Sequence, residues 1–166
     1  MSNTAPNPAH EPLAASASAE PLLVPLPDAP GFILLHHALV DLSVENPHGY
    51  LKPEYAAEIA PEYETDVRVT PLPATDSQRV DVMVRLSARA GIQVVFVMEV
   101  TYRAEVQLHR ISPEDAPRVL HVEVAEALFP MIKEILETCG RFAGYPDMEV
   151  YGVDFAAALA SHRAGG

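Results

Sequence analysis

Two acidic side chains four residues apart are the first candidates for chemistry. Asp41 and Glu45 stand in the segment HALVDLSVEN, in which apolar and polar residues alternate. Paired carboxylates can work as general acid and base when they line a cleft. The alternation predicts a strand, and it places both carboxylates on the outer, polar face of that strand. We therefore expect a solvated or partner-binding surface here rather than a catalytic pair.

Cysteine and histidine offer little further chemistry. Cys139 is the only cysteine, so the chain can form neither an internal disulfide nor a thiolate metal cluster. It falls on the apolar stripe of a predicted helix, which favours a buried small hydrophobic residue over a nucleophile. His36 and His37 are adjacent, but no histidine has HExxH or related ligand spacing. We expect no metal site.

Composition and short motifs argue against an enzyme and against several partners. The eight glycines are scattered, without a Gly-rich phosphate loop or a GxSxG elbow. A formal net charge of -12 disfavours binding to nucleic acid and to acidic membranes, and would attract a basic protein. No apolar run approaches the ~20 residues that span a bilayer. The first basic residue is Lys52, whereas a secretory signal starts with basic residues. We expect a cytoplasmic protein without a cofactor.

The chain divides into a tail and one domain. Seven of the 16 prolines fall in the first 30 residues, among many Ala and Ser. Such a segment cannot bury enough apolar area to offset its ordering entropy, so residues 1–31 are predicted to be a disordered tail. Residues 32–163 are predicted to form the folded domain, and residues 164–166 a flexible C-terminus.

Four alternating segments predict an antiparallel sheet with one covered face. In the first, Ala38, Val40, Leu42 and Val44 share the covered face, and in the second Tyr63, Thr65, Val67 and Val69 do so. The third runs through Val80, Val82, Val84, Leu86 and Ala88, turns near Gly91, and returns from Val94 to Leu108. The opposite face of the last strand carries Val95 and Val97 beside charged residues, which is typical of a protein-binding surface.

Helices are predicted after the strands. Ser112 is a predicted N-cap with Pro113 at the first helical position, and Asp154 caps a short last helix. Between them an apolar stripe recurs at helical spacing: Leu128, Met131, Ile132, Ile135, Cys139 and Phe142. Strands followed by helices indicate the α+β class, here a four-stranded antiparallel sheet with C-terminal helices packed on one face.

Four segments match a known family in the correct order: VDLSVENP, FVMEV, ALFPMIKEIL and GYPDMEVYGVDFAAAL. Through them the chain resembles the SecB family of bacterial protein-export chaperones from about Val40 to Leu159. The step from Glu99 to Pro130 also fits that family without a gap. The sequence departs from the family pattern at Ala104-Glu105-Val106, at Gly152, and in having no Trp.

The resemblance implies a homotetramer, built as a dimer of dimers, that acts as an ATP-independent holdase. It would bind unfolded preproteins and deliver them to the SecA translocation ATPase. Residues implied for SecA binding are Asp41, Glu45, Val97 and Glu99. Residues implied for client binding are Tyr50, Leu51, Tyr55 and Leu136. The resemblance also implies that Pro130 begins the long helix after a shorter helical segment.

Other functions stay open at this point. A SecB-like chaperone could serve another client, such as a toxin-antitoxin pair. A small-ligand-binding or enzymatic domain of hotdog or cystatin-like shape would also combine a curved sheet with a helix, but it needs a closed pocket with convergent polar groups. A structural oligomerisation module is the third alternative.

Overall fold

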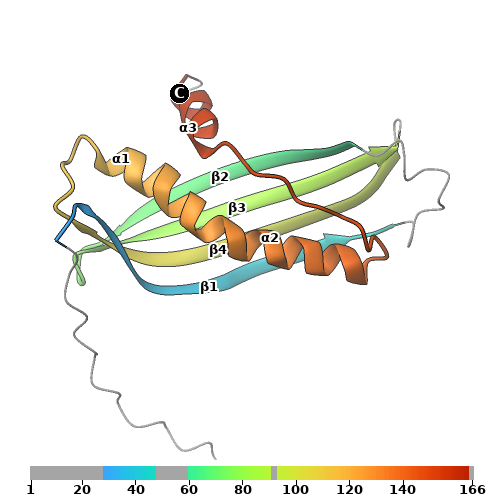
Figure 1. Ribbon diagram of the computed structural model, residues 1–166, viewed down its shortest axis with the longest axis horizontal. Coiled ribbons are helices and arrows are strands. Elements are labelled where there is room, and N and C mark those ends of the chain that lie inside the picture. Colours follow the sequence, from blue (N-terminus) through green and yellow to red (C-terminus); the bar gives the residue numbers. More distant parts are fainter. Residues whose placement is uncertain (1–27, 48–59, 91–92, 165–166) are drawn as a thin grey trace, which may run out of the picture.

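The computed structural model describes residues 28–47, 60–90 and 93–164 (Figure 1). Most of the predicted tail, residues 1–27, therefore lies outside the described residues, as do the predicted turn at Gly91 and the segment 48–59. The tail and its boundary stay predictions.

Four strands form one antiparallel sheet, as predicted. They are β1 (Gly31–Glu45), β2 (Ala60–Leu72), β3 (Ser77–Ala90) and β4 (Gln93–His109). Their order is β1-β4-β3-β2, so β2, β3 and β4 follow one another while β1 pairs with β4. The first and second strands of the chain are thus the two edges of the sheet.

Helices cover one face of this sheet, which we call the helix face, and leave an outer face (Figure 1). A short α1 (Ala116–Arg118) continues through a π-helical segment η2 (Val119–Glu123) into the long α2 (Val124–Phe142). After a loop, α3 (Phe155–Ala164) lies near β2. The α+β class and the packing of the helices on one face are therefore confirmed.

The core lies between the helix face and α2. Alternate residues of β3 are fully buried there, and they are the ones that the alternation predicted: Val80, Val82, Val84, Leu86 and Ala88. From α2, Leu128, Ile132 and Leu136 are fully buried against them. Phe142, which was predicted on the same stripe, is instead 88% exposed at the end of the helix.

A bulge in β4 changes the face of one residue from the face that was predicted. Phe96 pairs with Ala88, but the next pair is Val94 with Arg89, so Val95 is an extra residue in its strand. The bulge lets neighbouring residues share a face that strict alternation would separate. Val95 is 1% exposed, so its predicted place on the outer face is wrong.

Two bulges reverse the predicted faces of the residues between them in β1. Leu35 and Val40 have no partner in the register with β4, so the alternation shifts between them. His37 pairs with Ala104 and Leu39 with Tyr102, both on the helix face, while Ala38 pairs with Arg103 on the outer face. Alternation predicted Ala38 on the covered face and therefore His37 and Leu39 on the outer face, and these three predictions are wrong. The predicted faces from Asp41 onward are correct.

The predicted start and end signals of the helices are partly right. Ser112 Oγ accepts a hydrogen bond of 3.1 Å from the Asp115 N–H, as a capping hydroxyl does, but Pro113 lies in a turn and the regular helix begins at Ala116. At α3 the Ala157 N–H donates to Asp154 Oδ1 at 2.8 Å, which fits the predicted cap.

Pro130 does not begin a helix. It lies inside α2, which runs without a break from Val124 to Phe142, so the predicted two-segment boundary at Pro130 is wrong. Pro130 and Glu126 are both exposed. Water can therefore satisfy the Glu126 carbonyl, which lacks its usual N–H donor. The change of helical geometry occurs earlier, where η2 passes into α2 at Glu123.

A hydroxyl pair fixes the turn between β2 and β3 to β4. The Ser77 hydroxyl donates to Glu105 Oε1 at 2.5 Å, and Thr75 Oγ1 lies 3.2 Å from the same oxygen. These bonds favour the ionised carboxylate, so the pKa of Glu105 is lowered, chiefly by Ser77 and further by Thr75 and the charge of His36.

Acid should therefore destabilise the protein through Glu105. Because the folded-state pKa lies below the unfolded value, the stabilisation is present above about pH 4.3 and is lost as the pH falls through the folded pKa. We expect the urea midpoint to fall less between pH 6 and pH 3 in Ser77→Ala than in the parent. Ser87→Ala, a change on the same strand without this bond, should behave as the parent does. An unchanged pH dependence in Ser77→Ala contradicts the assignment.

Candidate functional site

The structure brings four predicted partner-binding residues to one corner of the outer face, which we call the acidic corner: Asp41, Glu45, Val97 and Glu99. The pairs that place them are Asp41 with Thr101, Ser43 with Glu99, and Glu45 with Val97. Opposite residues of antiparallel strands share a face, so all four side chains lie away from the helices. Asp41 and Glu45 are exposed, and Val97 and Glu99 are half-buried.

Charge on the outer face is unevenly distributed. Over β3 and β4 the charges are paired, as in the two bonds of 2.6 and 3.1 Å from Arg103 to Asp81. Glu99 has a looser ion pair of 3.9 Å with Arg85. In the described part of the chain, Asp41 and Glu45 form no ion pair. The charges of Asp41 and Glu45 therefore make the β1 edge negative, so that it would attract a cationic segment.

The predicted client residues are not gathered in one site by the described residues. Tyr50, Leu51 and Tyr55 lie outside them, in the segment 48–59. Leu136 is fully buried in the core of the single chain. Leu136 is therefore a packing residue in the single chain, and its contact with a client stays a prediction.

A side-chain amide directly after β1 bonds to the loop that follows α2. The side-chain amide of Asn46 donates to the Ala143 carbonyl at 2.8 Å, and the Tyr145 hydroxyl donates to Asn46 Oδ1 at 3.2 Å. Tyr145 in turn packs on Phe96, with ring centroids 4.7 Å apart. The chain after β1 therefore leaves from a point fixed beside the C-terminal end of α2.

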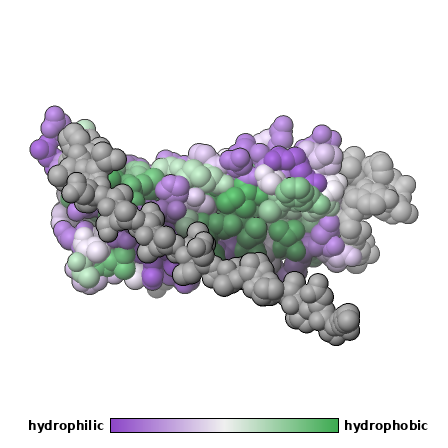
Figure 2. All heavy atoms as spheres, turned by 90° about the horizontal axis from the view of Figure 1, so that it is seen from below, coloured by the Kyte–Doolittle hydropathy of each residue, from purple (hydrophilic) through white to green (hydrophobic). Residues whose placement is uncertain are grey.

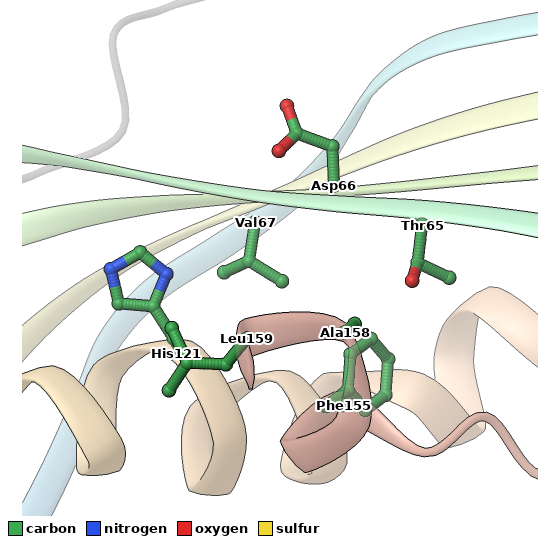
Figure 3. A pocket seen from close by; sticks show the side chains of 7 residues that line it. All are labelled: Thr65, Asp66, Val67, His121, Phe155, Ala158 and Leu159. Atoms are coloured by element: carbon green, nitrogen blue, oxygen red, sulfur yellow. The ribbon is translucent and has the colours of Figure 1, made fainter. Parts of the chain in front are cut away.

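A cavity of about 340 Å³, the α3 cavity, opens between β2, η2 and α3 (Figure 3). Its lining is mainly apolar, and consists of Thr65, Asp66, Val67, His121, Phe155, Ala158 and Leu159. Val67 and Thr65 point toward the helices, while Asp66 points away (Figure 3). This cavity was not predicted, because the sequence pattern assigned Thr65 and Val67 to the covered face of the sheet. A volume of this size suits a small ligand or a large side chain.

One edge of the sheet is apolar and open. Five large apolar residues of β1, which we call the apolar edge, are each 39–46% exposed: Leu35, Leu39, Val40, Leu42 and Val44. Figure 2, seen from the side on which β1 lies in Figure 1, shows hydrophobic residues gathered on this flank. The sequence placed Leu42 and Val44 under the helices, but α2 does not cover them.

A metal-binding cluster and an activated cysteine are both absent from the described residues. They contain no group of three or more His, Cys, Asp or Glu that could hold a metal ion. Burial raises the pKa of the Cys139 thiol, which makes it a poorer nucleophile. In the part of the chain that the structure describes, no helix is long and apolar enough to cross a membrane.

Comparison with known proteins points to one family. The family described as Preprotein translocase subunit SecB matches residues 27–165. A protein-export protein SecB of Beijerinckia indica is 32% identical over 120 residues, which are 70% of this chain and 73% of the relative. One from Zymomonas mobilis is 27% identical and covers 77% of each chain.

A solved structure has a similar fold. It is a SecB-like chaperone of Mycobacterium tuberculosis in complex with a peptide from an antitoxin. The TM-score is 0.61 with 19% sequence identity, and the match covers 74% of this chain and 91% of the other. At this identity the likeness supports the fold alone.

Proposed function

This chain belongs to the SecB family, whose members are protein-export chaperones and not enzymes, and we propose that it holds unfolded preproteins without ATP and delivers them to the SecA translocation ATPase in the cytoplasm. The observation that carries the proposal is the family match, which spans residues 27–165 and so covers the whole described fold.

The physical needs of a holdase fit the molecule. Such a protein requires no catalytic group, only apolar surface that binds extended chain in preference to folded chain. Burying one large apolar side chain of a client contributes about 1.5–3 kcal/mol, much of which is offset by ordering the client. Several weak sites therefore give a reversible complex.

The α3 cavity is the described site best suited to a client side chain. Its apolar lining, which includes Phe155 and Leu159, and the Thr65 hydroxyl at one wall suit a large apolar residue. Tyr50, Leu51 and Tyr55 are proposed as further client contacts on the family resemblance.

A folding assay tests the holdase proposal. The purified protein is mixed with a slowly folding preprotein, and in parallel with a protein that is already folded. We expect an equimolar amount of the oligomer to delay folding of the preprotein and to leave the folded protein unbound. The proposal is wrong if the folding rate of the preprotein does not change.

The acidic corner is proposed as the SecA-binding surface. Asp41 and Glu45 carry charges without ion-pair partners among the described residues, and the half-buried Val97 adds an apolar contact beside them. A basic, mobile segment of the partner would be steered to this surface and held there at low salt.

Charge reversal should separate SecA binding from client binding. In the triple variant Asp41→Lys, Glu45→Lys and Glu99→Lys, we expect affinity for SecA to fall at least about tenfold, because attraction becomes repulsion. Client holding should stay as in the parent. The triple reversal of Glu62, Glu64 and Asp66 to Lys, on β2 at the opposite edge of the outer face, is the matched control. Equal titration calorimetry results for both triples would remove the assignment.

The two edges of the sheet differ in a way that supports self-association through β1. Along β2, Pro61 and Pro71 lack backbone N–H donors and charged side chains alternate, which are usual protections of an edge strand. β1 has no proline and carries the apolar edge instead. We propose that β1 pairs with β1 of a second copy and that two such dimers form the homotetramer.

Export clients are favoured over an antitoxin client. The relatives named for protein export are 27–32% identical to this chain, whereas the SecB-like chaperone solved with an antitoxin peptide is 19% identical. Competition between a preprotein and that peptide for the purified protein separates the two possibilities.

A further inference from the structure

We propose that association of two copies through β1 is weakened by mild acid, because it brings the His37 side chains of both copies together. The proposal rests on the β1 pairing proposed above. It concerns the regulation of that contact, and its observations are the register of β1 and the surroundings of its two histidines.

The pattern of β1 indicates where a two-fold axis would lie. Two copies of one strand that pair antiparallel share a two-fold axis normal to the sheet, so opposite residues must lie on the same face. The strand runs from Gly31 to Glu45, and its midpoint is Ala38. An axis at Ala38 pairs the whole strand with itself.

This register brings like faces and like residues together. It sets Phe32 opposite Val44 and Leu34 opposite Leu42, and all four lie on the helix face in the pairing with β4. Ile33 meets Ser43, and both lie on the outer face. The bulged residues Leu35 and Val40 fall on opposite sides of the axis, so each half of the strand contains one. Faces therefore agree in every pair of this register in which both residues have a partner on β4.

His37 is the titratable residue nearest to this axis on the helix face. It would lie opposite Leu39 of the second copy, and the two His37 side chains become diagonal neighbours about 7–8 Å apart. On β4, Ala104 pairs with His37, and the Tyr102 hydroxyl lies 2.9 Å from its Nδ1. A neutral phenol can accept a hydrogen bond from the ring but cannot balance a charge.

His36 provides an internal comparison because its surroundings are different. It lies on the outer face opposite Glu105, whose carboxylate attracts a protonated imidazole. Arg103, the next charged residue on that face, is already paired with Asp81. On β1 itself the nearest carboxylate is Asp41, on the same outer face. In the described part of the chain no carboxylate bonds to His37.

The sign of the effect follows from linkage. Histidine is the side chain that ordinarily changes charge between about pH 5 and pH 8. In the separate chains the His37 side chain is exposed to water. Between two copies the charge would be desolvated beside Leu39 and repelled by its equivalent, so protons bind better to the separate chains. Association must then weaken as the pH falls.

Sedimentation equilibrium of the full chain at pH 7.5, 6.5 and 5.5 tests the proposal. For the parent we expect the dissociation constant of the dimer to rise at least about tenfold from pH 7.5 to pH 5.5, since each pH unit below the histidine titration costs up to about tenfold per copy. His37→Gln should associate with nearly the same constant at all three values. His36→Gln should keep the pH dependence of the parent.

The possible outcomes distinguish a failure of the role of His37 from a failure of the β1 pairing. A parent that is monomeric at pH 7.5 overturns the β1 pairing itself. A parent that associates with no pH dependence, or a His37→Gln variant that keeps the dependence, overturns the role of His37 alone. Far-ultraviolet circular dichroism at each pH shows whether the fold is intact, so that unfolding is not taken for dissociation.

Discussion

Leu42→Lys should break the proposed contact between two β1 strands at micromolar concentration. Leu42 lies on the helix face opposite Val100, and 41% of its surface is exposed. A lysine there adds a desolvated charge to each side of a symmetric contact. At about 2 kcal/mol for each copy, the two charges together cost about 4 kcal/mol, which raises the dissociation constant by about a thousandfold.

The other edge of the same sheet supplies the control. Thr70→Lys introduces the same side chain into β2, which already carries Arg68 and is bounded by Pro61 and Pro71. We expect Thr70→Lys to sediment as the parent does. Both variants should keep their far-ultraviolet circular dichroism, because neither side chain is buried in the single chain. If both variants dissociate, or neither does, β1 is not the contact.

The two edge strands fit the proposed association of two copies. A sheet with two unprotected edges would add strands without limit, whereas one protected edge and one open edge allow pairing to stop at two copies. The protections of β2 are therefore as informative as the apolar residues of β1. The sequence contained both patterns, but the order β1-β4-β3-β2, which makes them edges, came only from the structure.

Regular alternation predicted the buried face of β3 correctly because that strand has a regular neighbour on each side over most of its length. The same reasoning failed at Val95 and between Leu35 and Val40. A bulge adds one residue to a strand, and the hydrophobic pattern does not mark it when the residues around it are all compatible with both faces. In the run Leu35 to Val40 only pairing with β4 decides the faces.

Of the candidate sites, one could be predicted from the sequence and one could not. The outer-face position of the acidic corner could be predicted because its residues lie beyond the last bulge of β1 and after the bulge of β4 at Val95. The α3 cavity could not, because it depends on where α3 docks after a loop from the far end of α2. Pro130 misled the prediction because its exposed position, which makes a proline tolerable inside a helix, is a property of the tertiary structure.

Phe155→Ala should be among the most destabilising single changes in the domain. Phe155 is 1% exposed, and its ring meets that of Phe129 edge to face with centroids 5.8 Å apart. Removing a buried phenylalanine leaves a cavity and costs about 3–5 kcal/mol of the free energy of unfolding, measured by urea denaturation. The same change at Phe142, which is 88% exposed, should cost no more than about 0.5 kcal/mol.

Both substitutions are best made in the Leu42→Lys background, so that the β1 contact does not contribute to the measured stability. Phe155 begins α3 and also lines the α3 cavity, so its loss should free α3 from β2 and remove one wall of the proposed client site. We therefore expect Phe155→Ala, under conditions where it is still folded, to delay preprotein folding less than Phe142→Ala does. Equal free energies of unfolding for the two variants would show that α3 is not anchored through Phe155, and the cavity could then not serve as a preformed client site.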